Sequence, residues 1–162
     1  MRSQCTHKAR LFVISGICLA LALAVYCLTR SHPPALIPDY LLARDALVTV
    51  DGISGSAPSF LYTLAIALAL GASATSARAA GLHCLAWTGL CLLLEISQLP
   101  AIGAIILSGP GEMLTDSGLR IISPYWTRGT FDPGDLLATL LAGLLALALL
   151  ASTRARNVRA RP

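Results

Sequence analysis

The chain has 162 residues, of which 56% are hydrophobic and 12% are charged, roughly half the charged fraction of an ordinary soluble domain. This composition excludes an ordinary soluble globular domain and indicates an integral membrane protein. The net charge of +4 comes from basic residues at the ends of apolar runs and in the tails. Because they form no nucleic-acid motif with interleaved aromatic residues, we expect no nucleic-acid partner.

Residues 1–162 show no internal repeat and no composition shift, which predicts a single domain. The first predicted span runs from residue 11 to residue 28, an 18-residue stretch without charge that follows Lys8 and Arg10 and precedes Arg30. It is long enough to cross a bilayer. It exceeds the apolar core of a signal peptide and lacks a small-x-small cleavage site, so we expect a signal anchor.

The second predicted span covers residues 58–77. Ser56 is the expected N-cap, Pro58 suits the first turn, and Arg78 marks the end of the span. The segment is rich in Ala, Gly, Ser and Thr, which favours close packing between helices in lipid.

The third predicted span covers residues 80–99 and ends at Pro100. The fourth covers residues 134–152 and has a clear start signal, because Asp132 is a good N-cap and Asp135 meets the positive end of the helix dipole. The sequence therefore predicts an all-α polytopic membrane protein with four transmembrane helices.

The connections over residues 29–57 and 100–134 are long. Their apolar stretches are too short to span a bilayer, and Tyr40, Tyr125 and Trp126 suit the head-group region, so we expect interfacial or re-entrant segments there.

Eight of the 12 Lys and Arg residues fall on the side that holds both termini, which predicts an N-in/C-in orientation with both termini cytoplasmic. All eight acids fall in loops on the opposite, outward side or at helix positions near that outward side: Asp39, Asp45, Asp51, Glu95, Glu112, Asp116, Asp132 and Asp135.

Polar residues gather near the outer ends of the third and fourth predicted helices. Glu95 lies about three residues inside the end of its helix, and Gln98 follows at i+3 on the same face. An ionisable residue inside a span is by default a functional hypothesis. The predicted binding site comprises Glu95, Gln98, Arg128, Asp132, Asp135 and Thr139.

Two interpretations of this site stay open. In the first, Arg128 neutralises Glu95 and locks the third helix to the fourth, while Asp132 and Asp135 cap the fourth helix. In the second, the same residues bind a ligand or handle a proton.

The site residues resemble the motif of the VanZ-like membrane proteins. Glu95-x-x-Gln98, Arg128 and the segment Phe131-Asp132-Pro133-Gly134-Asp135-Leu136-Leu137 occur in the family's order and at its helix positions. Two positions differ, since the family's Asn is Thr139 here and its following Gly is Ala142. The resemblance covers mainly residues 82–150. It implies a multi-pass inner-membrane protein of the bacterial envelope, in a family linked to reduced susceptibility to the glycopeptide teicoplanin and without an agreed biochemical activity.

These observations favour a protein that binds a lipid-linked or envelope molecule, with membrane lipids and a glycopeptide-related ligand as expected partners. The alternatives are a non-enzymatic scaffold, as a homo-oligomer or a subunit of a membrane complex, and a small transporter. We find no recognised catalytic motif, which favours a non-enzymatic function. The five cysteines form no CxxC pair, and His83 lies about 18 Å along the helix from Glu95, so we expect neither a metal site nor a cofactor.

Overall fold

The computed structural model describes residues 2–29, 53–108, 125–126 and 130–159, and the predicted all-α fold is confirmed. The described residues form four long helices, α1 (Arg2–Thr29), α2 (Ile53–Ser73), α3 (Ala77–Ser97) and α7 (Pro133–Arg159), and a short helix, α4 (Pro100–Ser108), that follows α3. Each long helix contains 19 or 21 consecutive residues apolar enough to cross a membrane. The protein is therefore a multi-pass membrane protein with four candidate spans.

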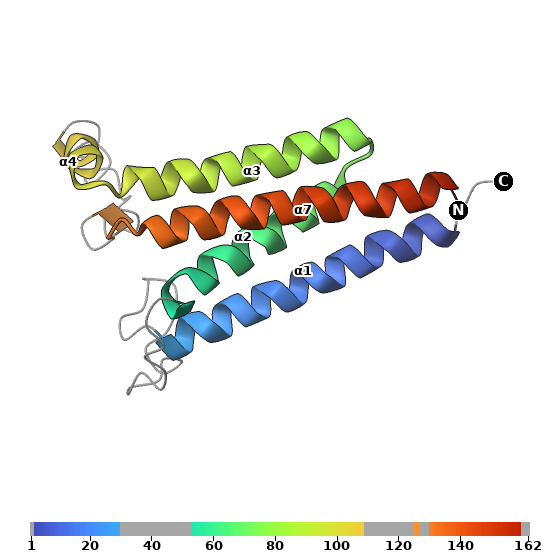
Figure 1. Cartoon of the computed structure of the whole chain (residues 1–162), viewed down its shortest axis with the longest axis horizontal. Helices are drawn as coiled ribbons and strands as arrows, with labels where there is room; N and C mark the ends of the chain where they lie inside the picture. Colours follow the sequence, from blue (N-terminus) through green and yellow to red (C-terminus); the bar gives the residue numbers. More distant parts are fainter. Residues whose placement is uncertain (1, 30–52, 109–124, 127–129, 160–162) are drawn as a thin grey trace, which may run out of the picture.

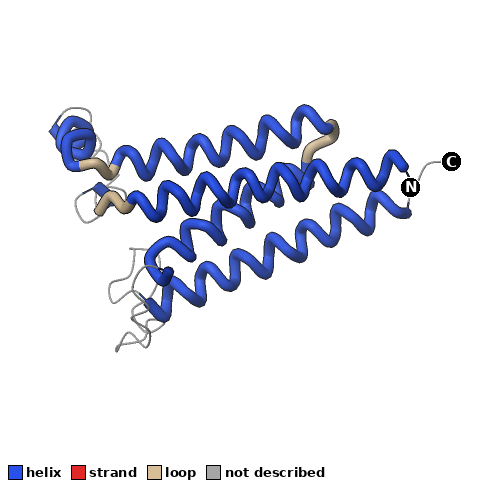
Figure 2. Tube along the Cα trace, in the orientation of Figure 1, coloured by secondary structure: helices blue, strands red, loops and turns tan. Residues whose placement is uncertain are grey.

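The helices form a bundle in which α2 is central, since it packs against α1, α3 and α7. The beginning of α1, the end of α7 and the turn between α2 and α3 lie at one end of this bundle (Figure 1). The opposite end holds the beginnings of α2 and α7 and the ends of α1 and α3 (Figure 2). The chain thus enters and leaves the bundle at the same end, as predicted, and the cytoplasmic location of that end stays a prediction.

The interior of the bundle is lined by small and polar side chains. The buried residues of α3 and of α7 recur every three or four positions, as one face of a helix requires. They are Ala80, Cys84, Thr88, Cys91 and Glu95 on α3, and Asp135, Thr139, Ala142, Ala146 and Leu150 on α7, where Gly143 beside Ala142 is also buried. The large leucines of the same helices point outward, with Leu82, Leu93 and Leu137 all more than half exposed. Small residues inside and large apolar residues outside are the arrangement expected in lipid.

Small residues also set how closely the helices approach. A methyl group added at Gly143 of α7 would lie 2.5 Å from the side chain of Thr88 on α3. Ala142 and Ala146, one turn apart on α7, are fully buried. On the α1 side, the Ser15 hydroxyl donates a hydrogen bond of 2.6 Å to the Ala65 carbonyl of α2, so polar contacts reinforce the packing.

The predicted limits of the second span are wrong at both ends. The α2 helix begins at Ile53, so Ser56 lies inside it rather than at its N-cap. Pro58 is the sixth residue of α2 and therefore lies inside the helix, where it removes one backbone hydrogen bond. The helix ends at Ser73, and Arg78 lies in the first turn of α3, whose N-cap is Ser76; its hydroxyl accepts from the Ala79 N–H at 3.1 Å.

The third span ends earlier than predicted, because α3 stops at Ser97 and Pro100 begins α4. Nine residues rise only about 14 Å, so α4 cannot cross a bilayer, as predicted. It is seen nearly end-on in Figure 1, across the end of the bundle rather than along it. Residues 30–52, which include Tyr40, and residues 109–124 and 127–129 lie outside the described part of the chain.

Candidate functional site

Polar side chains gather in the interior between α2, α3 and α7, at the end of the bundle that carries α4. All but one are less than 10% exposed, and Tyr62 is half-buried. We call this group the polar cluster; it consists of Tyr62 and Thr63 of α2, Cys91 and Glu95 of α3, and Asp135 and Thr139 of α7. It includes two carboxyl groups from different helices, Glu95 and Asp135, both of which interact electrostatically with Tyr125.

Glu95 supplies the α3 side of the polar cluster. It lies two residues before the end of α3 and is only 6% exposed. Tyr62 interacts electrostatically with Glu95 and Cys91 across the interface between α2 and α3. Burial of a carboxyl group is unfavourable without compensating polar neighbours, so Glu95 is a costly residue to place inside the bundle.

Asp135 supplies the α7 side. It is the third residue of α7, and its backbone N–H donates to the Asp132 carbonyl at 3.0 Å. Its side chain is 8% exposed, and Thr139 lies one turn further along the same buried face. The first turn of a helix favours a negative charge, so α7 itself stabilises an ionised Asp135.

Asp132 has a different position and role. The structure confirms it as the N-cap of α7, because its Oδ1 accepts from the Gly134 N–H at 2.8 Å. Its side chain is exposed and lies against the first turns of α2, since a methyl group at Gly55 would be 3.7 Å from Oδ2. Asp132 therefore caps the beginning of α7 and lies beside the beginning of α2, outside the polar cluster.

Two aromatic residues stand beside the ends of α3 and α7. Tyr125 and Trp126 pack edge to face with ring centroids 5.5 Å apart, and the Trp126 indole N–H donates to the Ser97 hydroxyl at 3.0 Å. Burial, together with the negative charge of Glu95, raises the pKa of Tyr125 to about 12. The phenol is therefore neutral at physiological pH and adjoins Glu95 and Gln98, with which it interacts.

The threonine hydroxyls of the interior are an unusual feature. Thr63 and Thr139 are fully buried. The Thr63 side chain interacts with those of Tyr62 and Cys91, whereas the Thr139 hydroxyl has no hydrogen-bond partner among the described residues. Thr139 therefore gives the polar cluster unused hydrogen-bonding capacity, which buried groups rarely keep.

The predicted site is thus only partly one site. Glu95, Asp135 and Thr139 face the same interior, whereas Asp132 caps α7. Gln98 is the C-cap of α3 and is half-buried beside Tyr125. Arg128 lies outside the described residues, so its predicted pairing with Glu95 stays a prediction.

Sequence reasoning missed three members of the cluster, Tyr62, Thr63 and Cys91. A signal for one of them exists, since Ser56, Ser59 and Thr63 follow the spacing of a single helix face. Over the described ranges, no three His, Cys, Asp or Glu residues group closely enough to hold a metal ion.

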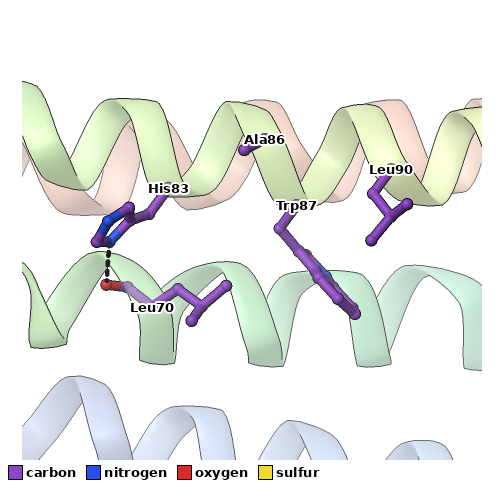
Figure 3. A pocket seen from close by; sticks show the side chains of 5 residues that line it. All are labelled: Leu70, His83, Ala86, Trp87 and Leu90. Carbon is purple, nitrogen blue, oxygen red and sulfur yellow. Dashed lines mark hydrogen bonds between the residues drawn. The ribbon is translucent and has the colours of Figure 1, made fainter.

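A separate hollow lies on the outer surface between α2 and α3. It has a volume of about 270 Å³ and is lined by Leu70, His83, Ala86, Trp87 and Leu90 (Figure 3). The His83 Nδ1 lies 3.3 Å from the Leu70 carbonyl oxygen. We call this hollow the apolar groove; its lining is almost wholly hydrocarbon, and its residues are distinct from those of the polar cluster.

Comparison of the chain with protein-family models, with curated proteins and with solved structures finds no match. The likeness to the VanZ-like proteins therefore depends on the short motif between Glu95 and Leu137 alone. The helical fold and the burial of Glu95 and Asp135 are observed in the structure and do not depend on this likeness.

Proposed function

We propose that this chain is a VanZ-like protein of the bacterial inner membrane that uses the polar cluster to bind a lipid-linked or other envelope molecule. The observation that carries the proposal is the burial of two carboxyl groups, Glu95 and Asp135, on the same interior as Thr139, whose hydroxyl has no hydrogen-bond partner among the described residues. Carboxylates and hydroxyls together accept and donate hydrogen bonds, as recognition of a polar head group or glycan requires.

The position of the cluster supports a ligand that is itself held in the membrane. Glu95 and Asp135 lie within one turn of the ends of α3 and α7, at the depth where the polar part of a lipid-linked molecule meets its apolar tail. Tyr125 and Trp126 offer aromatic surfaces at the same level. A ligand could therefore place its polar group among the carboxyl groups while its tail stays in lipid.

The orientation predicted from the basic residues would turn this end of the bundle toward the outside of the cell. Envelope precursors and glycopeptides are found on that side of the inner membrane. A role in glycopeptide susceptibility, as the resemblance implies, would then follow from binding such a molecule and requires no chemical reaction by the protein.

The test is the set of molecules that co-purify with the protein in mild detergent, identified by mass spectrometry. We expect a discrete envelope lipid to accompany the native chain and to be lost from Glu95→Gln and Asp135→Asn. The matched control is Asp132→Asn, which makes the same change of charge at an exposed position and retains a good N-cap. An identical set of co-purifying molecules in all four proteins would refute the proposal.

The scaffold alternative is favoured by the fact that the cluster joins three helices. If its residues serve only to hold α2, α3 and α7 together, Glu95→Gln and Asp135→Asn should lower the melting temperature and the amount of inserted protein. Unchanged melting temperatures with loss of the bound molecule would exclude that alternative.

A further inference from the structure

The polar cluster lies close to one end of the bundle, and yet its members are shielded. Glu95 is two residues from the end of α3 and Asp135 is the third residue of α7, but they are only 6% and 8% exposed. Cys91, one turn deeper on α3, is buried as well. Groups so near the ends of two helices stay buried when another segment lies over them, which directs attention to the residues that adjoin this end.

Tyr125 interacts with members of the cluster from all three of its helices. Its half-buried side chain also interacts with Gln98, the C-cap of α3. Its partners within the cluster come from α2, α3 and α7 and are Tyr62, Cys91, Glu95 and Asp135. A ring that interacts with side chains of three converging helices lies across the place where they meet. Tyr125 therefore covers the cluster rather than standing beside it.

Trp126 holds the Tyr125 ring in this position. The two rings pack edge to face with their centroids 5.5 Å apart. The Trp126 indole N–H donates to the Ser97 hydroxyl at 3.0 Å, and that hydroxyl donates in turn to the Leu94 carbonyl at 2.6 Å. Because the hydroxyl hydrogen is used within α3, the Ser97 oxygen is oriented as an acceptor for Trp126. The aromatic pair is thus tied to the end of α3 at a point outside the cluster.

We infer that Tyr125 and Trp126 close the polar cluster toward the end of the bundle that carries α4, and that a ligand reaches Glu95 and Asp135 by displacing the Tyr125 phenol. This inference rests on the proposed function, since it describes access to the same site. Tyrosine suits the position because its ring excludes water while its hydroxyl can meet the polar groups beneath it. The bond to Ser97 is a hydrogen bond between neutral groups, whose net contribution is small, so the closed arrangement can open.

The experiment uses the Cys91 thiol as a reporter inside the cluster. The chain has five cysteines, so the other four are replaced by alanine and thermal unfolding is checked. The full chain is placed in lipid nanodiscs, which leave both ends of the bundle open to water, and the rate of reaction with a membrane-impermeant methanethiosulfonate reagent is measured. A second protein keeps Cys84 alone, which is fully buried on the same face of α3 but about 10 Å further from the cluster.

We expect Cys91 to react slowly in the native arrangement and at least about tenfold faster in Tyr125→Ala, which removes the ring, while Cys84 stays unreactive. Ser97→Ala removes the hydrogen bond from Trp126 and should raise the Cys91 rate by about fivefold. The matched control is Ser108→Ala. It removes a hydroxyl that, like that of Ser97, donates to the carbonyl three residues earlier, but this bond lies within α4, so the rate should not change.

Three results would overturn the inference: rapid modification of Cys91 with Tyr125 and Trp126 intact, an unchanged rate in Tyr125→Ala, or an equal increase at Cys91 and Cys84, which would mean that the whole bundle has loosened. No ligand is added, so these rates do not depend on what the cluster binds. Failure of the proposed function would appear instead in the molecules that co-purify with the chain, and the two failures are therefore distinguishable.

Discussion

The contact between Gly143 and Thr88 gives the most direct test of the packing between α7 and α3. A Cβ atom added at Gly143 would lie 2.5 Å from both Cγ2 and Oγ1 of Thr88 and 3.0 Å from its Cβ. Thr88 is 7% exposed and has no room to move aside into lipid. We therefore expect Gly143→Ala to force the two helices apart or to distort the Thr88 rotamer.

The change in the free energy of unfolding of Gly143→Ala is the sum of two opposing effects. Overpacking of a filled interior costs about 1–3 kcal/mol, whereas alanine is more favourable than glycine inside a helix by about 0.5–1 kcal/mol. Gly89→Ala measures the second effect alone, because nothing lies within 4 Å of the added methyl group. The free energies of unfolding of the two variants should therefore differ by about 1–3 kcal/mol, or several degrees of melting temperature at roughly 2–4 °C per kcal/mol.

Thermal unfolding in a mild detergent, followed by tryptophan fluorescence, is the assay. Adding Thr88→Ala to Gly143→Ala removes the two atoms at 2.5 Å and should recover part of the lost stability, so the two substitutions should be non-additive by at least about 0.5 kcal/mol. If Gly143→Ala and Gly89→Ala melt at the same temperature, the close approach of α3 and α7 is wrong.

Three further variants test other contacts. Ser15→Ala removes the hydrogen bond to Ala65 and should lower the free energy of unfolding by roughly 0.6 kcal/mol, typical of such bonds in membranes, in the same melting assay. Asp132→Ala removes the N-cap of α7 and should cost about 0.5–2 kcal/mol, whereas Asp132→Asn should retain most of it; equal losses would contradict the capping role. The pKa of Tyr125 is raised from 10.0 to about 12, so its phenol is protonated in both states below pH 10 and ionises first in the unfolded chain above it. Stability should therefore fall between about pH 10 and pH 12, and Tyr125→Phe should lose that decrement and the tyrosinate step near pH 12 in an ultraviolet titration.

The four spans could be predicted from the sequence because apolar runs of this length have few other uses. The limits of the spans could not be predicted, since the ends of α2 depend on side chains that lie outside its apolar segment. Lys8 of α1 reaches the Ala74 carbonyl just beyond α2, and Ser76 caps α3. The helix therefore stops at Ser73 rather than continuing to Arg78, where a charge count alone would place its end.

The capping residues at the start of α7 were predicted correctly. Asp132, Pro133 and Asp135 act locally, through capping and the helix dipole, and local effects can be read from adjacent residues. Thr139 follows Asp135 at i+4, so its burial on the same face also comes from helix geometry alone.

The α2 members of the polar cluster could not be predicted, because their role depends on which helices pack against α2. Helix α2 contacts three other helices, so buried residues occur over most of its circumference, and neither Tyr62 nor Thr63 stands out by period. What singles them out is the partner across the interface: Tyr62 interacts with Glu95 of α3 and with Tyr125. The same argument explains why Asp132 and Asp135, three residues apart, differ so much in burial: Asp132 meets only the first turns of α2, whereas Asp135 faces the shared interior of three helices. Binding should therefore depend on Glu95 and Asp135 and not on Asp132, although the three acids are equivalent in the charge pattern of the sequence.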